Sequence, residues 1–168
     1  MIKFRNLAGI LAIALIFVGT TAAYVFTKAD FTGEWNFNEG KSKLGESRFR
    51  RAATKIKVGS EGESLVIERT QNTPNGEMTT SEKITFDGKA SESTAFGSMK
   101  RSSVGSWSAN GEEMTISTTI SGERDGQTFE FKTQEVWKLT DGGKTLTIES
   151  SANTPNGTTT QTLVYDKQ

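Results

Sequence analysis

The sequence predicts an all-β protein, an antiparallel meander of about eight to ten strands closed into a barrel. After residue 30, apolar side chains recur at every second position, Gly-containing turns separate the short stretches with this period, and helical periodicity is nearly absent. Strands that follow one another through tight turns, without a helical crossover, must pair antiparallel. The expected strands lie near 33–38, 53–60, 63–71, 77–86, 92–99, 102–109, 113–121, 127–139, 144–152 and 158–166.

A hairpin unit repeats along the chain. Each unit has an arm with apolar residues two apart, a turn, a returning arm, and an Asp that begins the next turn. Two units share the turn Asn-Thr-Pro-Asn-Gly, at 72–76 and 153–157, whereas the third has a longer turn at Asp125-Gly126 without Pro. Pro fixes φ at the first corner and Asn-Gly tolerates the positive φ that follows, which suits tight turns. Repeated hairpins form a meander, and a meander closes naturally into an up-and-down barrel.

The phase within the strands predicts which side chains face inward. Along 127–139, Phe129, Phe131, Trp137 and Leu139 share one face, because alternate side chains of a strand point the same way. In all three units the apolar positions lie farthest from the hairpin turn, and the positions near the turn are polar. We therefore expect one end of the barrel to be a packed core and the other to be a polar interior or mouth.

The first residues have the three parts of a secretory signal peptide. Lys3 and Arg5 precede the uncharged run 7–19, and the small residues 20–23 follow it. We expect residues 1–23 to be a signal peptide and residues 30–168 to be one barrel domain. The alternative is an uncleaved membrane anchor extending to residue 26, because the uncharged stretch is then long enough to span a bilayer. Both interpretations place the domain outside the cytoplasm, either periplasmic or secreted, or anchored to the membrane.

The composition excludes several classes of function. Without Lys3 and Arg5, eighteen basic and twenty acidic side chains remain, a net charge of −2, which gives no reason to expect nucleic acid or an acidic membrane as a partner. The only expected membrane contact is through an uncleaved N-terminal segment. The chain has no Cys and no His, which excludes disulfides, thiol chemistry, imidazole acid–base catalysis and His-containing zinc sites. We expect no cofactor and no metal, since the spacing of a calcium loop is also absent.

Four polar side chains fall on predicted inward faces and are the candidate ligand-binding residues: Arg69, Glu82, Glu135 and Gln161. Arg69 could pair with a ligand carboxylate through its bidentate fork, while a Glu accepts a hydrogen bond from a ligand hydroxyl. Alternatively, Arg69 pairs internally with a Glu, or these residues meet water at the open end, because an unpaired charge inside a barrel is costly. Glu82 and Glu135 could also act as acid and base in glycoside hydrolysis, which requires a defined separation between them.

A basic segment spans the connection between the first two expected strands. Its members are Lys41, Lys43, Arg48, Arg50, Arg51, Lys55 and Lys57, with only Glu46 among them. It could be a lid or an anion-attracting rim, or else a solvated loop that runs into an edge strand protected by Lys.

One short motif gives a family resemblance. Gly33-x-Trp35 opens the first strand ahead of the meander, and this resembles the start of the lipocalin and fatty-acid-binding-protein group of barrels. The resemblance implies that the Trp closes the barrel floor, that the barrel holds a ligand cavity, and that the protein is a carrier. The chain departs from lipocalins, which place an Arg near the barrel end to cover this Trp, because its last Arg is Arg124. The hairpins with Asp-Gly-Lys turns are more similar to lipocalin-like exported bacterial proteins of unassigned function.

These observations favour an exported, non-enzymatic barrel that binds a small apolar or amphipathic ligand. An inward face that mixes aromatics with Thr, Gln and a few charges suits a pocket better than a dry core. Two alternatives remain open. The first is an envelope structural or interaction protein with a solid barrel, and the second is a carboxylate-dependent hydrolase.

Overall fold

A computed structural model describes residues 27–45, 52–95, 99–124, 126–154 and 157–168 of the chain. In this part the protein is almost entirely β-structure, which confirms the predicted fold class. The ten strands are β1 (Gly33–Phe37), β2 (Lys55–Glu61), β3 (Ser64–Thr73), β4 (Gly76–Ile84), β5 (Ser91–Ala95), β6 (Met99–Trp107), β7 (Glu113–Arg124), β8 (Gln127–Thr140), β9 (Thr145–Thr154) and β10 (Gly157–Lys167). Two single-turn 3-10 helices, η1 (Glu39–Lys41) and η2 (Asp141–Gly143), lie in connections. None of the helices in the described part is long and apolar enough to cross a bilayer.

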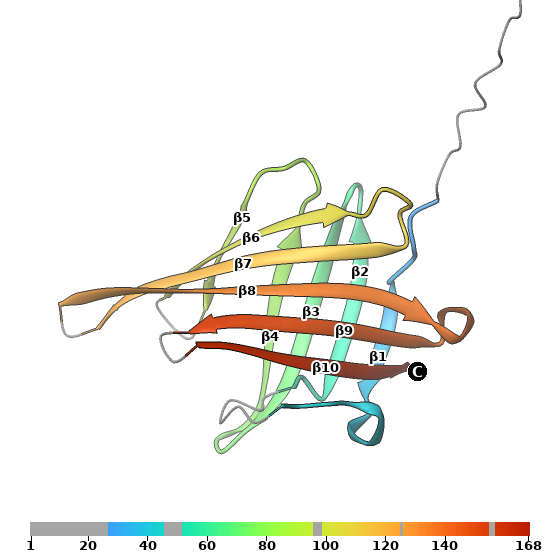
Figure 1. The fold of residues 1–168 in the computed structure, drawn as a ribbon, viewed down its shortest axis with the longest axis horizontal. Helices are drawn as coiled ribbons and strands as arrows, with labels where there is room; N and C mark the ends of the chain where they lie inside the picture. Colours follow the sequence, from blue (N-terminus) through green and yellow to red (C-terminus); the bar gives the residue numbers. More distant parts are fainter. Residues whose placement is uncertain (1–26, 46–51, 96–98, 125, 155–156) are drawn as a thin grey trace, which may run out of the picture.

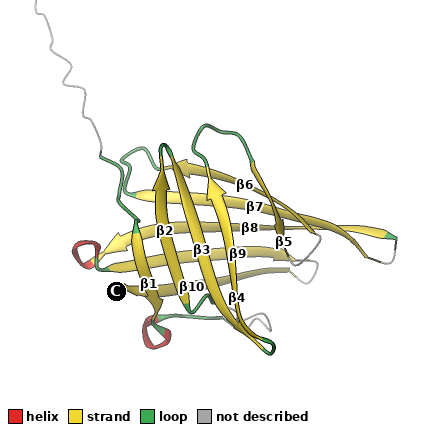
Figure 2. Cartoon of the chain, turned by 180° about the vertical axis from the view of Figure 1, so that it is seen from behind, coloured by secondary structure: helices red, strands yellow, loops and turns green. Residues whose placement is uncertain are grey.

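All ten strands belong to one antiparallel sheet, in the order β4-β3-β2-β1-β10-β9-β8-β7-β6-β5. The chain therefore runs as a meander, and the first strand closes against the last, with Trp35 opposite Lys167. In Figure 1, β6–β10 form a layer whose strands run across those of β2–β4 behind it. The view from behind brings β1–β4 to the front and shows the same crossing (Figure 2). The sheet is thus folded over on itself as a nearly closed barrel.

The three predicted hairpins are confirmed as β3–β4, β7–β8 and β9–β10. The main correction concerns the expected strand 92–99. In the structure β5 ends at Ala95, and Met99 pairs with it as the first residue of β6. The sequence pattern could not show this break, because polar and small residues dominate on both sides of it and the period-2 signal is weak there.

The barrel has one seam, between β4 and β5, which are the two ends of the sheet. At one end of the seam the two layers meet through Gly105 of β6. A Cβ at this glycine would lie 2.5 Å from Ile84 Cγ2 and 2.8 Å from a ring carbon of Phe86. Only glycine permits this close approach. Apolar packing therefore joins the two layers at the seam, where β4 and β5 share no ladder of backbone hydrogen bonds.

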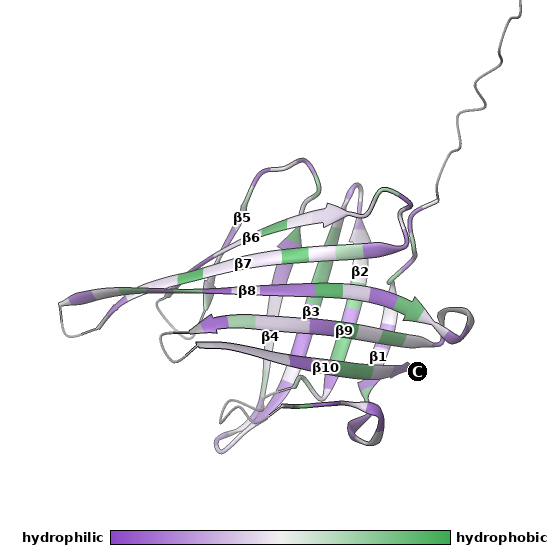
Figure 3. Ribbon diagram, in the orientation of Figure 1, coloured by the Kyte–Doolittle hydropathy of each residue, from purple (hydrophilic) through white to green (hydrophobic). Residues whose placement is uncertain are grey.

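The packed core occupies the end of the barrel predicted from the strand phase. It is built from inward positions of β1–β4 and β7–β10 and is fully buried at Trp35, Ile56, Ile67, Trp137 and Leu146. Figure 3 shows the hydrophobic parts of β9 and β10 towards the end of these strands near the C-terminus. We call this end of the barrel the closed end. Burial of these large side chains is the main source of stability available to the domain.

The segment before β1 seals the closed end. Ala29 N donates to Gly111 O at 2.9 Å, which fixes the segment beside the β6–β7 connection. Phe31 is buried, stacks on Trp107 with a centroid distance of 5.8 Å, and meets Trp137 edge-on at 5.9 Å. The chain immediately after the expected leader is therefore part of the core. The leader itself, residues 1–23 or 1–26, lies outside the described residues.

Trp35 forms the floor at this end, as the Gly-x-Trp resemblance implies. Its indole N–H donates to Phe31 O at 2.9 Å, and the Lys167 ammonium lies 5.1 Å from the ring centroid. Lys167 thus covers the Trp ring where lipocalins use an Arg. Gly33 makes room for it, because a Cβ there would lie 3.1 Å from Lys167 Cε and φ is +124°. The two residues of the motif Gly33-x-Trp35 are therefore linked: Gly33 leaves the room that Lys167 needs to lie over the Trp35 ring.

Candidate functional site

Four charged side chains meet inside the barrel, just beyond the packed core. They are Arg69 of β3, Glu82 of β4, Arg101 of β6 and Glu135 of β8, and we call this group the charged belt. Each follows the inward alternation of its strand: Arg69 is two residues from Ile67, and Glu135 is two residues from Trp137. Their side chains are 8–19% exposed, so the belt is largely removed from water.

The strongest contact joins the two layers of the barrel. Arg69 donates from both terminal nitrogens to the two carboxylate oxygens of Glu135, each at 2.8 Å. The Trp137 indole N–H donates to the same carboxylate at 2.9 Å, and the Arg69 guanidinium lies 5.5 Å from the Trp137 ring centroid. A bidentate Arg–carboxylate pair with a third donor is a rigid arrangement, because both charged groups are held by several hydrogen bonds at once.

Glu82 links the belt across the seam of the barrel. One of its oxygens lies 3.4 Å from Arg69 Nη2, and the other lies 3.4 Å from Arg101 Nη1 and 3.5 Å from Ser103 Oγ. Ser103 in turn shares a 2.9 Å hydrogen bond with Thr118 of β7. Since β4 and β5 are not paired, these side-chain contacts between β4 and β6 hold the two sheet ends together in place of a backbone ladder.

The electrostatics of the belt keep its strongest pair ionised. Burial alone would raise the pKa of Glu135, but the charge of Arg69, its two hydrogen bonds and the Trp137 N–H outweigh burial, and the pKa lies below its ordinary value. Burial alone would lower the pKa of Arg69, but Glu135 and Glu82 raise it overall. Nearby, burial raises the pKa of the Tyr165 phenol, although the charge of Arg69 acts in the opposite direction.

The belt also holds hydrogen-bond donors that the protein leaves unused. Within the described part of the chain, Nε of Arg69 and Nε of Arg101 are buried and have no hydrogen-bond partner. An unsatisfied buried N–H costs roughly 1–3 kcal/mol, so such groups are uncommon in folded proteins. Both N–H groups are covered by protein atoms, so a hydrogen-bonding partner reaches them only when the side chains that cover them move aside.

Beyond the belt, the inner face becomes solvent-accessible and mixes polar residues, such as Gln71 and Thr80, with apolar ones. Met78, on the inward face of β4 opposite Gln71, is 39% exposed, unlike the buried inward residues Glu82 and Ile84 farther along the strand. On the facing layer, Phe129 and Phe131 of β8 stack on each other with centroids 5.7 Å apart. We call this end of the barrel the mouth. It lies near the hairpin turns, as expected, but its interior also carries apolar side chains, which the expectation of a polar end did not include.

The structure brings three of the four predicted site residues together. Arg69, Glu82 and Glu135 are in contact, and their arrangement is the internal Arg–Glu pairing that the sequence left open as an alternative. Gln161 lies on the same inner side: it pairs with Ser150, which pairs with Glu135. It is half-buried, and in the described residues it makes no hydrogen bond to the belt. Gln161 is therefore a neighbour of the belt and not a member of it.

The same geometry disfavours the hydrolase interpretation. A glycosidase needs one carboxyl that stays protonated as the general acid, which requires a raised pKa. Glu135 has a lowered pKa and is bound at both oxygens, and Arg69 contacts both carboxylates. Two carboxylates bridged by one guanidinium are arranged as ion-pair partners and not as an acid–base pair.

Sequence reasoning missed Arg101 and Ser103. The expected strand begins at residue 102, which puts Arg101 just outside it. Trp107 could have revealed both residues. If the strand is extended towards its start, positions 101 and 103 fall on the same face as Trp107, because alternate side chains of a strand point the same way. The run Met-Lys-Arg-Ser-Ser has no apolar alternation of its own, which is why the strand start was not evident.

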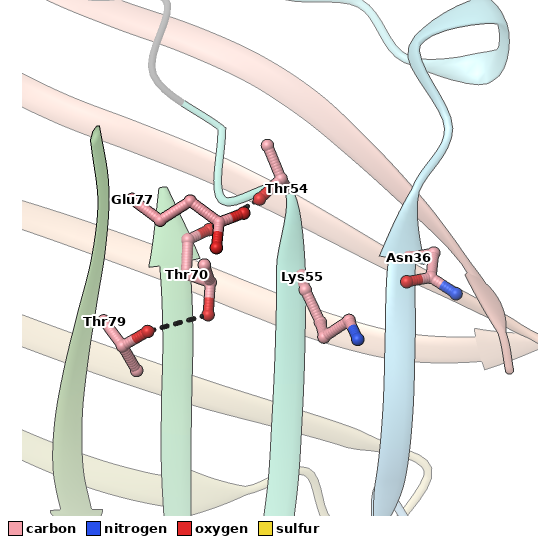
Figure 4. A pocket seen from close by; sticks show the side chains of 6 residues that line it. All are labelled: Asn36, Thr54, Lys55, Thr70, Glu77 and Thr79. Atoms are coloured by element: carbon pink, nitrogen blue, oxygen red, sulfur yellow. Dashed lines mark hydrogen bonds between the residues drawn. The ribbon is translucent and has the colours of Figure 1, made fainter. Parts of the chain in front are cut away.

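Two hollows on the described part of the molecule lie away from the charged belt. The first, of about 350 Å³, is on the outer surface of β1–β4 (Figure 4). Its lining is polar and consists of Asn36, Thr54, Lys55, Thr70, Glu77 and Thr79. Thr70 and Thr79 share a 3.0 Å hydrogen bond across it. The second, of about 490 Å³, lies along the β7–β8 hairpin near Lys100 and Phe129. Neither hollow includes a residue of the charged belt.

The described part of the chain thus has the fold of a ten-stranded antiparallel barrel like that of fatty-acid-binding proteins, with charged groups inside. Among solved structures, the chain is similar to the ileal bile acid-binding protein of zebrafish, crystallised with cholic acid. The TM-score is 0.54 and the sequence identity is 18%, and the similarity covers 82% of this chain and 98% of that one. At this identity the likeness concerns the fold. No protein-family model and no curated protein matches the sequence.

Proposed function

We propose that this protein is an exported, non-enzymatic barrel that binds a small amphipathic ligand at the mouth, with the polar part of the ligand at the charged belt. One observation supports this above all: the inner face between Met78 and Glu82 passes from solvent-exposed apolar surface to a buried polar cluster within a single strand. An apolar surface with a few convergent polar groups is the usual composition of a small-molecule site.

The fold comparison is consistent with this proposal. The zebrafish protein of similar fold was crystallised with cholic acid, an amphipathic small molecule. Export of our chain rests on its first 23 residues, with their basic start, apolar run and small-residue exit. Intact-mass measurement of the protein purified from its own host tests the leader: a mass lacking residues 1–22 or 1–23 supports cleavage. A full-length mass in the membrane fraction indicates the anchored form instead.

Ligand binding can be tested directly. Native mass spectrometry of the protein from its host should show a bound small molecule, and the apo-protein should take up the neutral fluorophore N-phenyl-1-naphthylamine saturably. A protein without co-purified ligand and without saturable uptake would end the carrier proposal.

A matched pair of variants locates the uptake. Met78 points inward on β4 and its neighbour Thr79 points outward, and both are exposed. Met78→Lys should weaken fluorophore binding at least about fivefold, because it replaces an apolar contact with a charge. Thr79→Lys should change the affinity by less than about twofold. Equal effects of the two substitutions would place the binding site outside the barrel.

A second candidate function is an interaction protein with a solid barrel, favoured by the position of the hollow around Lys55 on the outer surface (Figure 4). Of the basic segment proposed from sequence, Arg48, Arg50 and Arg51 lie outside the described residues, whereas Lys55 lines this hollow and lies 3.7 Å from Glu34. Lys55→Glu should then abolish capture of an envelope partner while fluorophore uptake is retained. Lys83→Glu, on the outer face of β4 and outside the hollow, is the matched control.

A further inference from the structure

The charged belt is balanced in charge, and this limits what it can bind. It contains two guanidinium groups, Arg69 and Arg101, and two carboxylates, Glu82 and Glu135. Every carboxylate contacts at least one guanidinium, and Arg69 contacts both carboxylates. The belt thus has no net charge to attract an ion into the barrel.

An anionic ligand would have to break the strongest pair to gain a partner. Both terminal nitrogens of Arg69 are engaged by Glu135 at 2.8 Å. A ligand carboxylate that took these nitrogens would leave Glu135 buried with only the Trp137 N–H, and it would lie beside a second negative group. Removing one partner of a buried ion pair is strongly unfavourable, because the other charge stays in the low-dielectric interior.

The two unpartnered donors of the belt suit a neutral acceptor, which reaches them once the side chains that cover them move aside. Nε of Arg69 and Nε of Arg101 are buried without a partner in the described residues, and each offers one N–H. A hydroxyl, ester or amide oxygen can accept such a hydrogen bond without displacing Glu82 or Glu135. The ion pairs stay intact, and the cost of the two unsatisfied donors is relieved.

We propose that the ligand of this site is an uncharged amphipath, with hydroxyl, ester or amide oxygens next to an apolar chain, and that the belt selects against the corresponding anion. This inference rests on the proposed ligand-binding function and specifies the chemical class that the function would serve.

Three compounds with the same chain test the selectivity: dodecanoic acid, its monoglyceride and its amide, each displacing N-phenyl-1-naphthylamine from the full domain at neutral pH. The monoglyceride and the amide should bind at least about tenfold more tightly than dodecanoate, equivalent to about 1.4 kcal/mol. Dodecanoate binding as tightly as either neutral compound overturns the inference while leaving the carrier function intact. Failure of every probe, including the fluorophore, overturns the carrier function itself.

Glu135→Gln gives a second and sharper test. The amide keeps the shape of the carboxylate and can still accept from Trp137, but it no longer neutralises Arg69. Dodecanoate affinity should therefore rise about tenfold in this variant, and the preference for the monoglyceride should shrink. Glu130→Gln is the matched control, since Glu130 lies on the outer face of the same strand and pairs with Lys132. A Glu135→Gln protein that is folded by circular dichroism and shows no gain in dodecanoate affinity contradicts the proposal.

Discussion

The closed end and the mouth of this barrel are built by the same strands with the same alternation, yet their interiors differ. At the closed end, Trp35, Ile56 and Leu146 are completely buried, and the segment before β1 seals them from solvent. At the mouth, Met78 points inward but is exposed, and the charged belt separates it from the core. Alternation therefore decides whether a side chain faces inward, whereas its position along the strand decides whether that interior is packed or polar.

This difference suggests a division of roles. The closed end buries large aromatic and aliphatic side chains and so stabilises the fold. The belt adds ionic contacts between the layers, but buried ion pairs contribute little net stability because desolvation offsets their attraction. If the comparison is correct, substitutions at the closed end should be the most damaging to stability, those in the belt less so, and those on the surface least.

The largest effect is expected for Trp35→Ala. Trp35 is fully buried and its indole N–H is hydrogen-bonded to Phe31 O, so its removal leaves a cavity at the barrel floor. We expect a loss of about 3–5 kcal/mol in the free energy of unfolding. Urea unfolding followed by circular dichroism measures it. A loss below about 1 kcal/mol would show that the closed end is not the main source of stability.

Arg69→Met should follow, with a loss of about 3 kcal/mol, because Glu135 and Glu82 are left buried with fewer partners. The double variant Arg69→Met/Glu135→Leu should recover most of this loss, since it removes the unpaired charge together with its partner. The same unfolding experiment compares the two. A double variant no more stable than the single one would mean that the pair stabilises the fold directly.

The pH dependence of stability isolates Glu135. Its pKa is lower in the folded protein than its ordinary value of 4.5, so its contribution is complete above that pH and is lost as the pH falls through the folded pKa. The free energy of unfolding of the wild type, relative to that of Glu135→Gln, should therefore be highest at neutral pH. The difference should decrease between about pH 5 and pH 3. A constant difference across this range would show that Glu135 is not held ionised by Arg69.

The smallest effect is expected at Lys167. Lys167→Met keeps the apolar stem beside Gly33 but removes the ammonium from the Trp35 ring, which should cost about 0.5–1 kcal/mol. Lys83→Met removes an exposed ion pair with Glu61 and should change stability by less than about 0.5 kcal/mol. Thermal or urea unfolding of both variants separates them. Identical losses would mean that the contact over the floor Trp is no stronger than an ordinary surface pair.

Much of the fold was accessible from the sequence because it depends on local patterns. The period-2 alternation located ten strands, and the repeated Asn-Thr-Pro-Asn-Gly turns at 72–76 and 153–157 marked two hairpins. The alternation also placed Arg69, Glu82 and Glu135 on inward faces. It failed at Arg101, where the strand start has no apolar periodicity. It placed Gln161 on an inward face but could not show that this residue stays outside the belt.

By itself, then, the sequence determined the class of fold, the inward faces and the presence of charges among them, since each of these follows from residues close together in the chain. Only the tertiary structure decided that Arg69 binds Glu135, 66 residues away, that Glu82 joins β6 across the seam, and that Lys167 covers Trp35. These contacts depend on how far the sheet curls and on which strands face each other across the barrel. Both are set by the packing of the whole core, and no single strand encodes them.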